Sequence, residues 1–284
     1  MPPSPVQRLP NDIICELFYI VAELDPPRIA RCQEDRLYEK PGSLGWIRMT
    51  HVCRGWRGVG LDMSTLWAGV VCVFPPGVET IARRTKTTPL TLTFHSNASP
   101  NEVWDNIERL GIFPRVRSLK RIQIQSLEKH FSLRDWSLYL LGQHLPYLRD
   151  LELDLATFTN AAFRQLRPLN APALKSLTVN VPLAITAPSL TFLCADGSIW
   201  QAKLLLDYLR CYPSLIELHV HSVFGDLPHE DQLIPPKALH VAEQMARDIA
   251  GLCIVRLTHL QRLTFFTAGV NAAQVLQHLD IPIS

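Results

Sequence analysis

Two histidines, His219 and His221, come closest in this sequence to a catalytic or metal-binding pattern. Side chains two apart on a strand point to one face, so this pair could ligate a metal ion. No third ligand stands at a telling spacing, and the alternative is a pair of ordinary surface histidines. The sequence also contains no GxSxG, HExxH, GxxxxGK[ST] or cysteine-protease signature. We therefore predict a protein that is not an enzyme and uses no cofactor or metal.

Two further patterns could contact phosphate. The glycines of Gly55-x-x-Gly58-x-Gly60 follow a predicted helix, whereas a dinucleotide fingerprint follows a strand and has its glycines in another order. A small basic patch combines Arg115, Arg117, Lys120 and Arg121. A solvated face explains it more simply than a phosphate contact site does. Neither pattern predicts nucleotide binding.

Composition indicates a folded protein with a neutral charge balance. The chain has 284 residues, of which 47% are hydrophobic and 19% charged, with a formal net charge of +2. Nothing in that balance calls for nucleic acid or an anionic membrane, and no stretch is apolar for long enough to span a bilayer. The seven cysteines are scattered without a CxxC pair, which favours free thiols in a reducing compartment. We expect a soluble protein of the cytoplasm, the nucleus or both.

The stretch Leu44 to Trp67 carries three of the six tryptophans. Its spacing predicts one helix, with Ser43 as N-cap and an end near Val59, where glycines become frequent. Its apolar residues fall in one sector, and the basic residues fall on the opposite side. These apolar positions are Trp46, Met49, Val52, Cys53, Trp56 and Val59. Such an aromatic-rich element is typical of an interface.

An earlier helix should begin at Pro10 and continue through the apolar run that ends at Leu24. Its apolar residues spread over roughly 160°, which is wider than one small core requires. Two interpretations remain open: the whole sector packs inside this protein, or part of it stays exposed for a partner.

Three blocks of the N-terminal region occur in a recognisable order: LPNDIICELF from Leu9 to Phe18, VCRGW from Val52 to Trp56, and Leu66-Trp67. Together they resemble the F-box family, and the sequence GWIRMTHVCRGWR is most similar to the mushroom-type fungal members. The resemblance covers about the first seventy residues. The charged segment 25–44 is a long insertion relative to the family pattern. This gives a loose segment 1–8 and an F-box domain at 9–69.

The resemblance implies that this domain docks on Skp1, and through Skp1 on a cullin-RING ubiquitin ligase. Trp56 and Trp67 would be the main contributors to binding. The residues carried over by motif position are Leu9, Pro10, Ile13, Ile14, Leu17, Val52, Cys53, Trp56, Leu66 and Trp67.

Residues 70–284 contain a degenerate repeat with apolar residues at positions 0, 3 and 5. It is similar to the L-x-x-L-x-L of leucine-rich repeats. One 16-residue step leaves no room for a full helix. Strands alternating with helices predict an α/β fold, an irregular solenoid with a parallel curved sheet. We expect strands at Val70–Phe74 and Pro89–Phe94 and a helix around Val78–Thr85 before the repeats. The segments between strands should form helices at Asn101–Leu110, Leu133–His144, Ala161–Leu166, Gln201–Cys211, Lys237–Cys253 and Ala272–Leu279. The last repeat has no evident polar cap, which is compatible with a truncated C-terminus.

Residues between the repeat leucines should point out of the sheet. On a concave face they would bind a target protein; the alternative is a merely soluble face. These residues are Gln123, Gln125, Glu152, Asp154, Thr178, Asn180, Cys194, Asp196, His219, His221, Thr264 and Phe266.

These observations predict a substrate-recognition adaptor of an SCF-type (Skp1-cullin-F-box) E3 ubiquitin ligase. Its F-box would bind Skp1, and its repeats would bind an unidentified target protein. The alternative is a leucine-rich-repeat interaction scaffold whose F-box is vestigial. An enzyme of unrecognised type is a third class, which a pocket joining His219 and His221 to Asp196 would favour.

Overall fold

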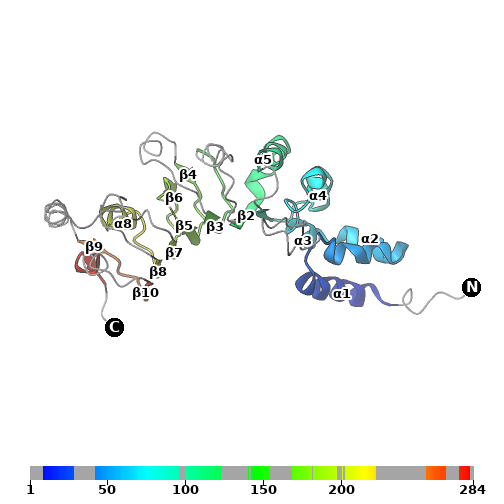
Figure 1. Cartoon of the computed structure of the whole chain (residues 1–284), viewed down its shortest axis with the longest axis horizontal. Coiled ribbons are helices and arrows are strands. Elements are labelled where there is room, and N and C mark those ends of the chain that lie inside the picture. Colours follow the sequence, from blue (N-terminus) through cyan, green and yellow to red (C-terminus); the bar gives the residue numbers. More distant parts are fainter. Residues whose placement is uncertain are drawn as a thin grey trace, which may run out of the picture. The chain divides into compact units, whose positions relative to one another are not determined.

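The computed structural model describes residues 9–28, 42–95, 100–122, 140, 142–153, 168–180, 182–196, 200, 202–221, 254–266 and 275–281 (Figure 1). The chain is mixed α/β, with helices and a seven-stranded parallel sheet in the order β1-β2-β3-β5-β7-β8-β10. It divides into two compact units, Met1–Asp135 and Trp136–Ser284. The predicted α/β class with a parallel sheet is therefore confirmed.

Unit 1 begins with four helical elements. Helix α1 spans Asn11–Leu24, and Pro10 is its N-cap residue, within one position of the predicted start. A 3-10 helix, η2, spans Gly45–His51 and is followed by α2 (Arg54–Asp62) and α3 (Ser64–Ala68). The predicted single helix from Leu44 to Val59 is therefore wrong.

The break between η2 and α2 has a packing reason. Cys53 is extended, with φ −158° and ψ 174°, so the chain turns between the two elements. The Phe18 ring lies 6.0 Å from the Trp46 ring and 6.2 Å from the Trp56 ring, centroid to centroid. In one straight helix, two residues that are ten positions apart lie about 15 Å apart along the helix axis. Trp46 and Trp56 could not then both contact the same phenyl ring. The break lets both indoles pack on one phenyl ring.

The rest of unit 1 contains two strands, two further α-helices and two 3-10 turns. After a 3-10 turn, η3 (Pro75–Gly77), come α4 (Val78–Arg84), β1 (Leu90–His95), α5 (Pro100–Arg109), a 3-10 turn η4 (Phe113–Arg115) and β2 (Val116–Ile122). Strands β1 and β2 pair in parallel. The predictions for α4, β1 and α5 are confirmed within one residue. The predicted strand at Val70–Phe74 is wrong: this segment forms turns, and its apolar run reflects burial of Val70 to Val73.

Unit 2 contains the repeat strands from Leu148 onward, whereas the first repeat match, at Leu119 and Ile122, lies in β2 of unit 1. The long strands are β3 (Asp150–Leu153), β5 (Ser176–Val179), β7 (Phe192–Ala195), β8 (Glu217–Val220) and β10 (Arg262–Phe265), paired in parallel. Leu151, Leu177, Leu193 and Leu218 are aligned and buried across four of them. Helix α8 (Ala202–Leu209) lies between β7 and β8, close to the predicted position. The repeat leucines thus form the core of this unit.

Three of the long strands are each preceded by a short strand at the same distance along the sequence. Strands β4 (Leu169–Asn170) and β6 (Ile185–Thr186) pair with each other, as do β9 (Val255–Arg256) and β11 (Leu279–Asp280). The strands β4, β6 and β9 begin at 169, 185 and 255, and the following long strands begin seven residues later, at 176, 192 and 262. The 16-residue step holds β6 and no helix among its described residues, as predicted.

Several predictions concern other parts of the chain. The expected loose segment 1–8, most of the inserted segment, and the helices expected at 133–144, 161–166 and 237–253 lie wholly or largely outside the described residues, as do Gln123, Gln125 and Asp154. The helix expected from Ala272 to Leu279 ends earlier than predicted, because Leu279 belongs to β11.

Candidate protein-binding surfaces

The tryptophans of the F-box-like region lie in the core of unit 1. Trp67 is 1% exposed and Trp56 is 7% exposed. The Trp67 indole Nε1 donates a hydrogen bond to the carbonyl oxygen of Gly60 at 2.8 Å, and the Trp46 ring packs on it edge to face at 4.8 Å. The guanidinium carbon of Arg84 lies 4.5 Å from the ring centroid on its face. The expectation that Trp56 and Trp67 form exposed anchors is therefore corrected: their aromatic surface is used inside this chain.

The last glycine of the Gly55-x-x-Gly58-x-Gly60 pattern has a packing role. All three glycines lie within α2, and Gly60 is buried against Phe18. A Cβ atom at Gly60 would lie 2.7 Å from Phe18 Cζ and 2.8 Å from Thr50 Cγ2. Only a residue without a side chain allows this close approach of α2 to α1.

Helix α1 keeps an exposed apolar stripe, defined by Ile13, Leu17, Ile20 and Leu24. At 100° per residue these positions fall within about 60° of one another. Ile13 and Ile20 are exposed, Leu24 is 80% exposed and Leu17 is half-buried. Ile14 and Phe18 fill the core from the adjacent side of the helix. Part of the wide sector is thus open, so the interpretation that the whole sector packs inside this protein is wrong.

The other residues carried over from the F-box resemblance differ in exposure. Pro10 and Val52 are exposed, Leu9, Cys53 and Leu66 are half-buried, and Ile14 is buried. Sequence reasoning omitted Ile20 and Leu24 from the candidate site. The spacing 13, 17, 20, 24 was the signal for them, because it places four apolar residues along one line of a helix.

The two ends of the inserted segment 25–44 are held together by backbone hydrogen bonds. Arg28 and Ser43 form an antiparallel bridge in which each backbone N–H donates to the other residue's carbonyl oxygen at 2.8 Å. Asp25 forms an ion pair with Arg48 beside it. Gly45 has φ +54°, and a Cβ there would lie 2.3 Å from the Asp25 carbonyl oxygen. The two ends of the insertion are therefore fixed together.

Unit 2 presents what we call the polar sheet face. On β3, β5 and β8 its members alternate with buried residues, as predicted. Register places the members in rows across β3, β5, β7, β8 and β10. One row contains Asp150, Ser176, Phe192, Glu217 and Arg262. The next contains Glu152, Thr178, Cys194, His219 and Thr264. The third, one residue beyond the strands, contains Asn180, Asp196, His221 and Phe266.

Ion pairs and aromatic contacts link side chains at the β8–β10 end of this face. Glu217 Oε1 lies 2.7 Å from Arg262 Nη1 and 2.8 Å from His219 Nε2. These hydrogen bonds, first that from Arg262 and then that from His219, hold the pKa of the Glu217 carboxyl below its usual value. The His221 ring lies 4.3 Å from that of Phe266, which is 57% exposed.

Cys194 lies in the middle row and is the most buried member of the face. Burial, followed by the nearby charges of Asp196 and Glu152, raises the pKa of its thiol to about 11. The thiol is therefore neutral at physiological pH. His221 Nδ1 lies 3.3 Å from Asp196 Oδ1, but among the described residues no group of three or more His, Cys, Asp or Glu side chains could hold a metal.

The basic patch does not act as one surface. The Arg115 guanidinium donates hydrogen bonds to Thr85 Oγ1 and to the Thr88 carbonyl oxygen, both at 2.8 Å, and so joins the turn after α4 to the start of β2. Arg117 and Lys120 are exposed. Burial lowers the pKa of Arg115. Its hydrogen bonds within the chain give it a structural role.

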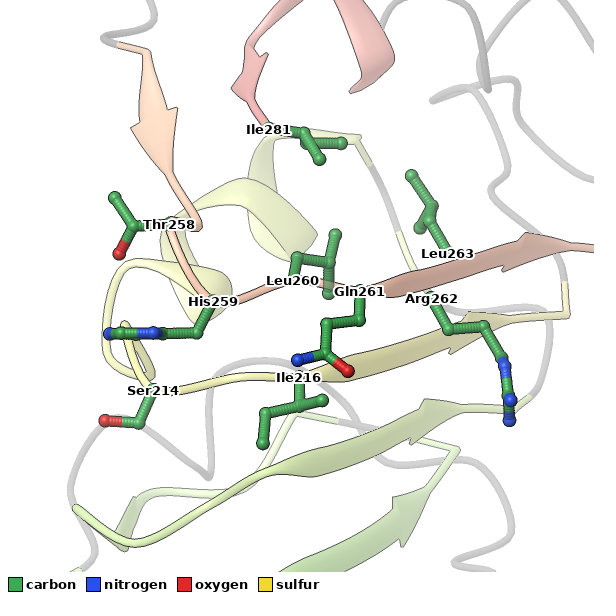
Figure 2. Close-up of a pocket in the computed structure, with 9 residues that line it drawn as sticks. All are labelled: Ser214, Ile216, Thr258, His259, Leu260, Gln261, Arg262, Leu263 and Ile281. Atoms are coloured by element: carbon green, nitrogen blue, oxygen red, sulfur yellow. The ribbon is translucent and has the colours of Figure 1, made fainter. Parts of the chain in front are cut away.

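A pocket of about 580 Å³ lies beside the segments that lead into β8 and β10 (Figure 2). Ser214 and Ile216 come from the first segment, and His259, Leu260 and Gln261 come from the second, with Ile281 opposite them. The pocket does not include His219, His221 or Asp196. Its lining mixes apolar and polar side chains. The sequence did not indicate it because Leu260 and Leu263 fit the repeat pattern of core residues, and the polar lining residues form no motif.

Comparisons with protein-family models, with curated proteins and with solved structures found no match. Within the part of the chain that the structure describes, no helix has the length and apolar character needed to cross a bilayer.

Proposed function

We propose that this protein is a substrate-recognition adaptor of an SCF-type E3 ubiquitin ligase. Unit 1 binds Skp1, unit 2 binds a target protein, and ubiquitin transfer is carried out by other subunits of the ligase. The adaptor has no active site of its own and raises the effective concentration of the target near the ligase. This role belongs to the cytoplasm or the nucleus.

The apolar stripe of α1 is the observation that carries the proposal. Three large side chains of one helix line, Ile13, Ile20 and Leu24, are exposed although the same helix fills the core with Ile14 and Phe18. An exposed apolar line of this kind suits a helix that packs into a groove of a partner. Val52, in the VCRGW block, adds a further exposed apolar side chain. The order of the three F-box-like blocks supports Skp1 as that partner.

The buried tryptophans change how the partner is bound. Trp46, Trp56 and Trp67 set the positions of α1, η2 and α2, and the exposed stripe makes the contact. The tryptophans are thus required for the interface through the fold and not through direct contact. The polar sheet face of unit 2 is the candidate site for the target.

A co-purification of the full chain with a fungal Skp1 tests this proposal. We expect the variant I13A/I20A/L24A to lose at least about tenfold in Skp1 recovery, because these side chains are the central anchors. The variant E16A/E23A, which changes exposed positions of the same helix outside the stripe, should bind as the unchanged protein does. Equal recovery of Skp1 by both variants would contradict the proposal. Skp1 binding without cullin recruitment would favour the interaction scaffold with a vestigial F-box.

A further inference from the structure

The polar sheet face has an uneven charge. Its described members include four carboxylates, on Asp150, Glu152, Asp196 and Glu217, and one guanidinium, on Arg262. With neutral histidines, this is a formal charge of −3 on the described part of the face, although the whole chain carries +2. Arg262 is already paired with Glu217. The remaining negative charge is therefore concentrated on β3 and at the end of β7.

Three of these carboxylates, on Asp150, Glu152 and Asp196, are open to a partner. Within the described part of the chain, neither Asp150 nor Glu152 takes part in an ion pair, and both side chains are partly exposed. Asp196 contacts His221 at 3.3 Å and is itself exposed. Glu152 lies in the same row as Cys194, two strands away, and Asp196 follows Cys194 by two residues on the same face, so both charges lie close to the middle of the face.

The opposite end of the face is aromatic. Phe266 is exposed beside His221, and the His219 ring lies 6.1 Å from that of Phe266 and 5.3 Å from that of Phe192. An exposed phenyl ring among polar neighbours offers apolar contact area that a soluble surface does not require. Aromatic residues at such positions are also the usual anchors of protein interfaces.

We propose that the polar sheet face binds an extended segment of the target that carries lysine or arginine side chains at one end and a large apolar side chain at the other. The basic side chains contact Asp150, Glu152 and Asp196, and the apolar side chain packs on Phe266. Charge complementarity identifies the occupant: the negative face repels nucleic acid, acidic peptides and phosphorylated peptides.

The dimensions fit a short peptide. From β3 to β10 there are four strand spacings, or about 19 Å at about 4.8 Å each. An extended chain covers this distance with about six residues at about 3.3 Å each. A segment running across the strands would thus meet the acidic end and the aromatic end at once. This inference rests on the proposed function in that it names the target class of the same adaptor.

Selection from a library of random heptapeptides on the immobilised full chain, without Skp1, provides the test. We expect enriched peptides to contain at least two basic residues and one large apolar residue. Selection of acidic or uncharged peptides, or no enrichment, would overturn the inference. Because Skp1 is absent, failure here leaves the co-purification with Skp1 unaffected, so the two proposals fail separately.

Affinity of the most enriched peptide, labelled with fluorescein and measured by anisotropy, then locates its site. The variant D150N/E152Q/D196N should bind at least about tenfold more weakly, since three exposed charge pairs are lost. F266S should bind about fivefold more weakly, with the loss persisting at high salt because that contact is apolar. The control D62N/E108Q/D207N removes the same number of charges elsewhere and should bind within about twofold of the unchanged protein. Equal weakening by the control and the first variant would refute a specific site, and thermal melting checks that each variant is folded.

Discussion

Gly60 of α2 lies directly against the ring of Phe18 in α1, at a distance that excludes any side chain: a Cβ atom would be 2.7 Å from Phe18 Cζ. The same glycine's carbonyl oxygen accepts the Trp67 indole hydrogen bond. One residue therefore joins α1, α2 and α3, and the apolar stripe owes its position to this contact.

Replacement of Gly60 by alanine should destabilise the protein by about 1–3 kcal/mol, because the new methyl group overpacks the core. Gly58 provides a matched control in the same helix, since nothing lies within 4 Å of a Cβ there. We expect G58A to stabilise the protein by up to about 1 kcal/mol through its higher helix propensity. Urea denaturation of both variants measures the difference, and equal midpoints would contradict the packing described here.

Trp56→Ala should cost about 3–5 kcal/mol of folding free energy, as expected for a large side chain removed from a core. Leu24→Ala, in the exposed stripe, should change stability by less than about 0.5 kcal/mol. Denaturant titration distinguishes the two roles. A folded, fully stable W56A protein would show that the indole is not a core residue after all.

The insertion should be removable. Arg28 and Ser43 exchange both backbone hydrogen bonds, which is the geometry of residues flanking a two-residue hairpin turn. Replacing residues 29–42 by Asn-Gly should therefore keep unit 1 folded. The shorter loop should add up to about 1.7 kcal/mol of stability, at about 0.6 kcal/mol for each halving of loop length. Thermal melting and Skp1 co-purification of this variant are the measurements, and loss of the folded state would show that the insertion itself contributes to the core.

Alkaline pH should destabilise the protein. Burial raises the pKa of Cys194 to about 11 and that of Tyr212 to about 12, and it also raises the pKa of Cys72. These groups ionise at lower pH in the unfolded chain, so stability is full below the unfolded pKa values and falls as the pH rises towards the folded ones. We expect the urea midpoint to decrease between pH about 9 and about 11.

The contribution of Cys194 can be separated from the others. In C194A the decrease with pH should be shallower, whereas C211A, which changes an exposed cysteine, should follow the unchanged protein. If C194A and the unchanged protein show the same dependence on pH, the thiol does not contribute.

The sequence predicted the repeat strands well because their leucines report burial directly. Leu151 and Leu153 are buried on either side of the partly exposed Glu152, and the same alternation recurs at Leu177 and Leu218. Helix α1 was equally clear from Pro10 and the double proline after Leu24. In both cases local signals and tertiary burial agree.

The tryptophan segment was harder to predict, because an apolar residue type does not distinguish a side chain buried in the core from one buried by a partner. By residue type alone, Trp56 and Trp67 fit an interface and a core equally well. Their contacts with Phe18 and Gly60, which place them in the core, are visible only in the three-dimensional structure. The break at Cys53 follows from the same packing. The apolar run at Val70 was misleading for a related reason, because buried turns can be as apolar as strands.

The constant seven-residue offset between short and long strands has a consequence for how this chain can change in length. The connection from β5 to β6 is much shorter than the connection from β8 to β9. The distance along the chain from a short strand to the long strand that follows it is the same in both cases. In these three repeats the stretch from the short strand to the long strand is constant in length, and the connection before the short strand is the part that varies. A lineage could lengthen or shorten those connections freely and still inherit the same alignment of acidic and aromatic side chains.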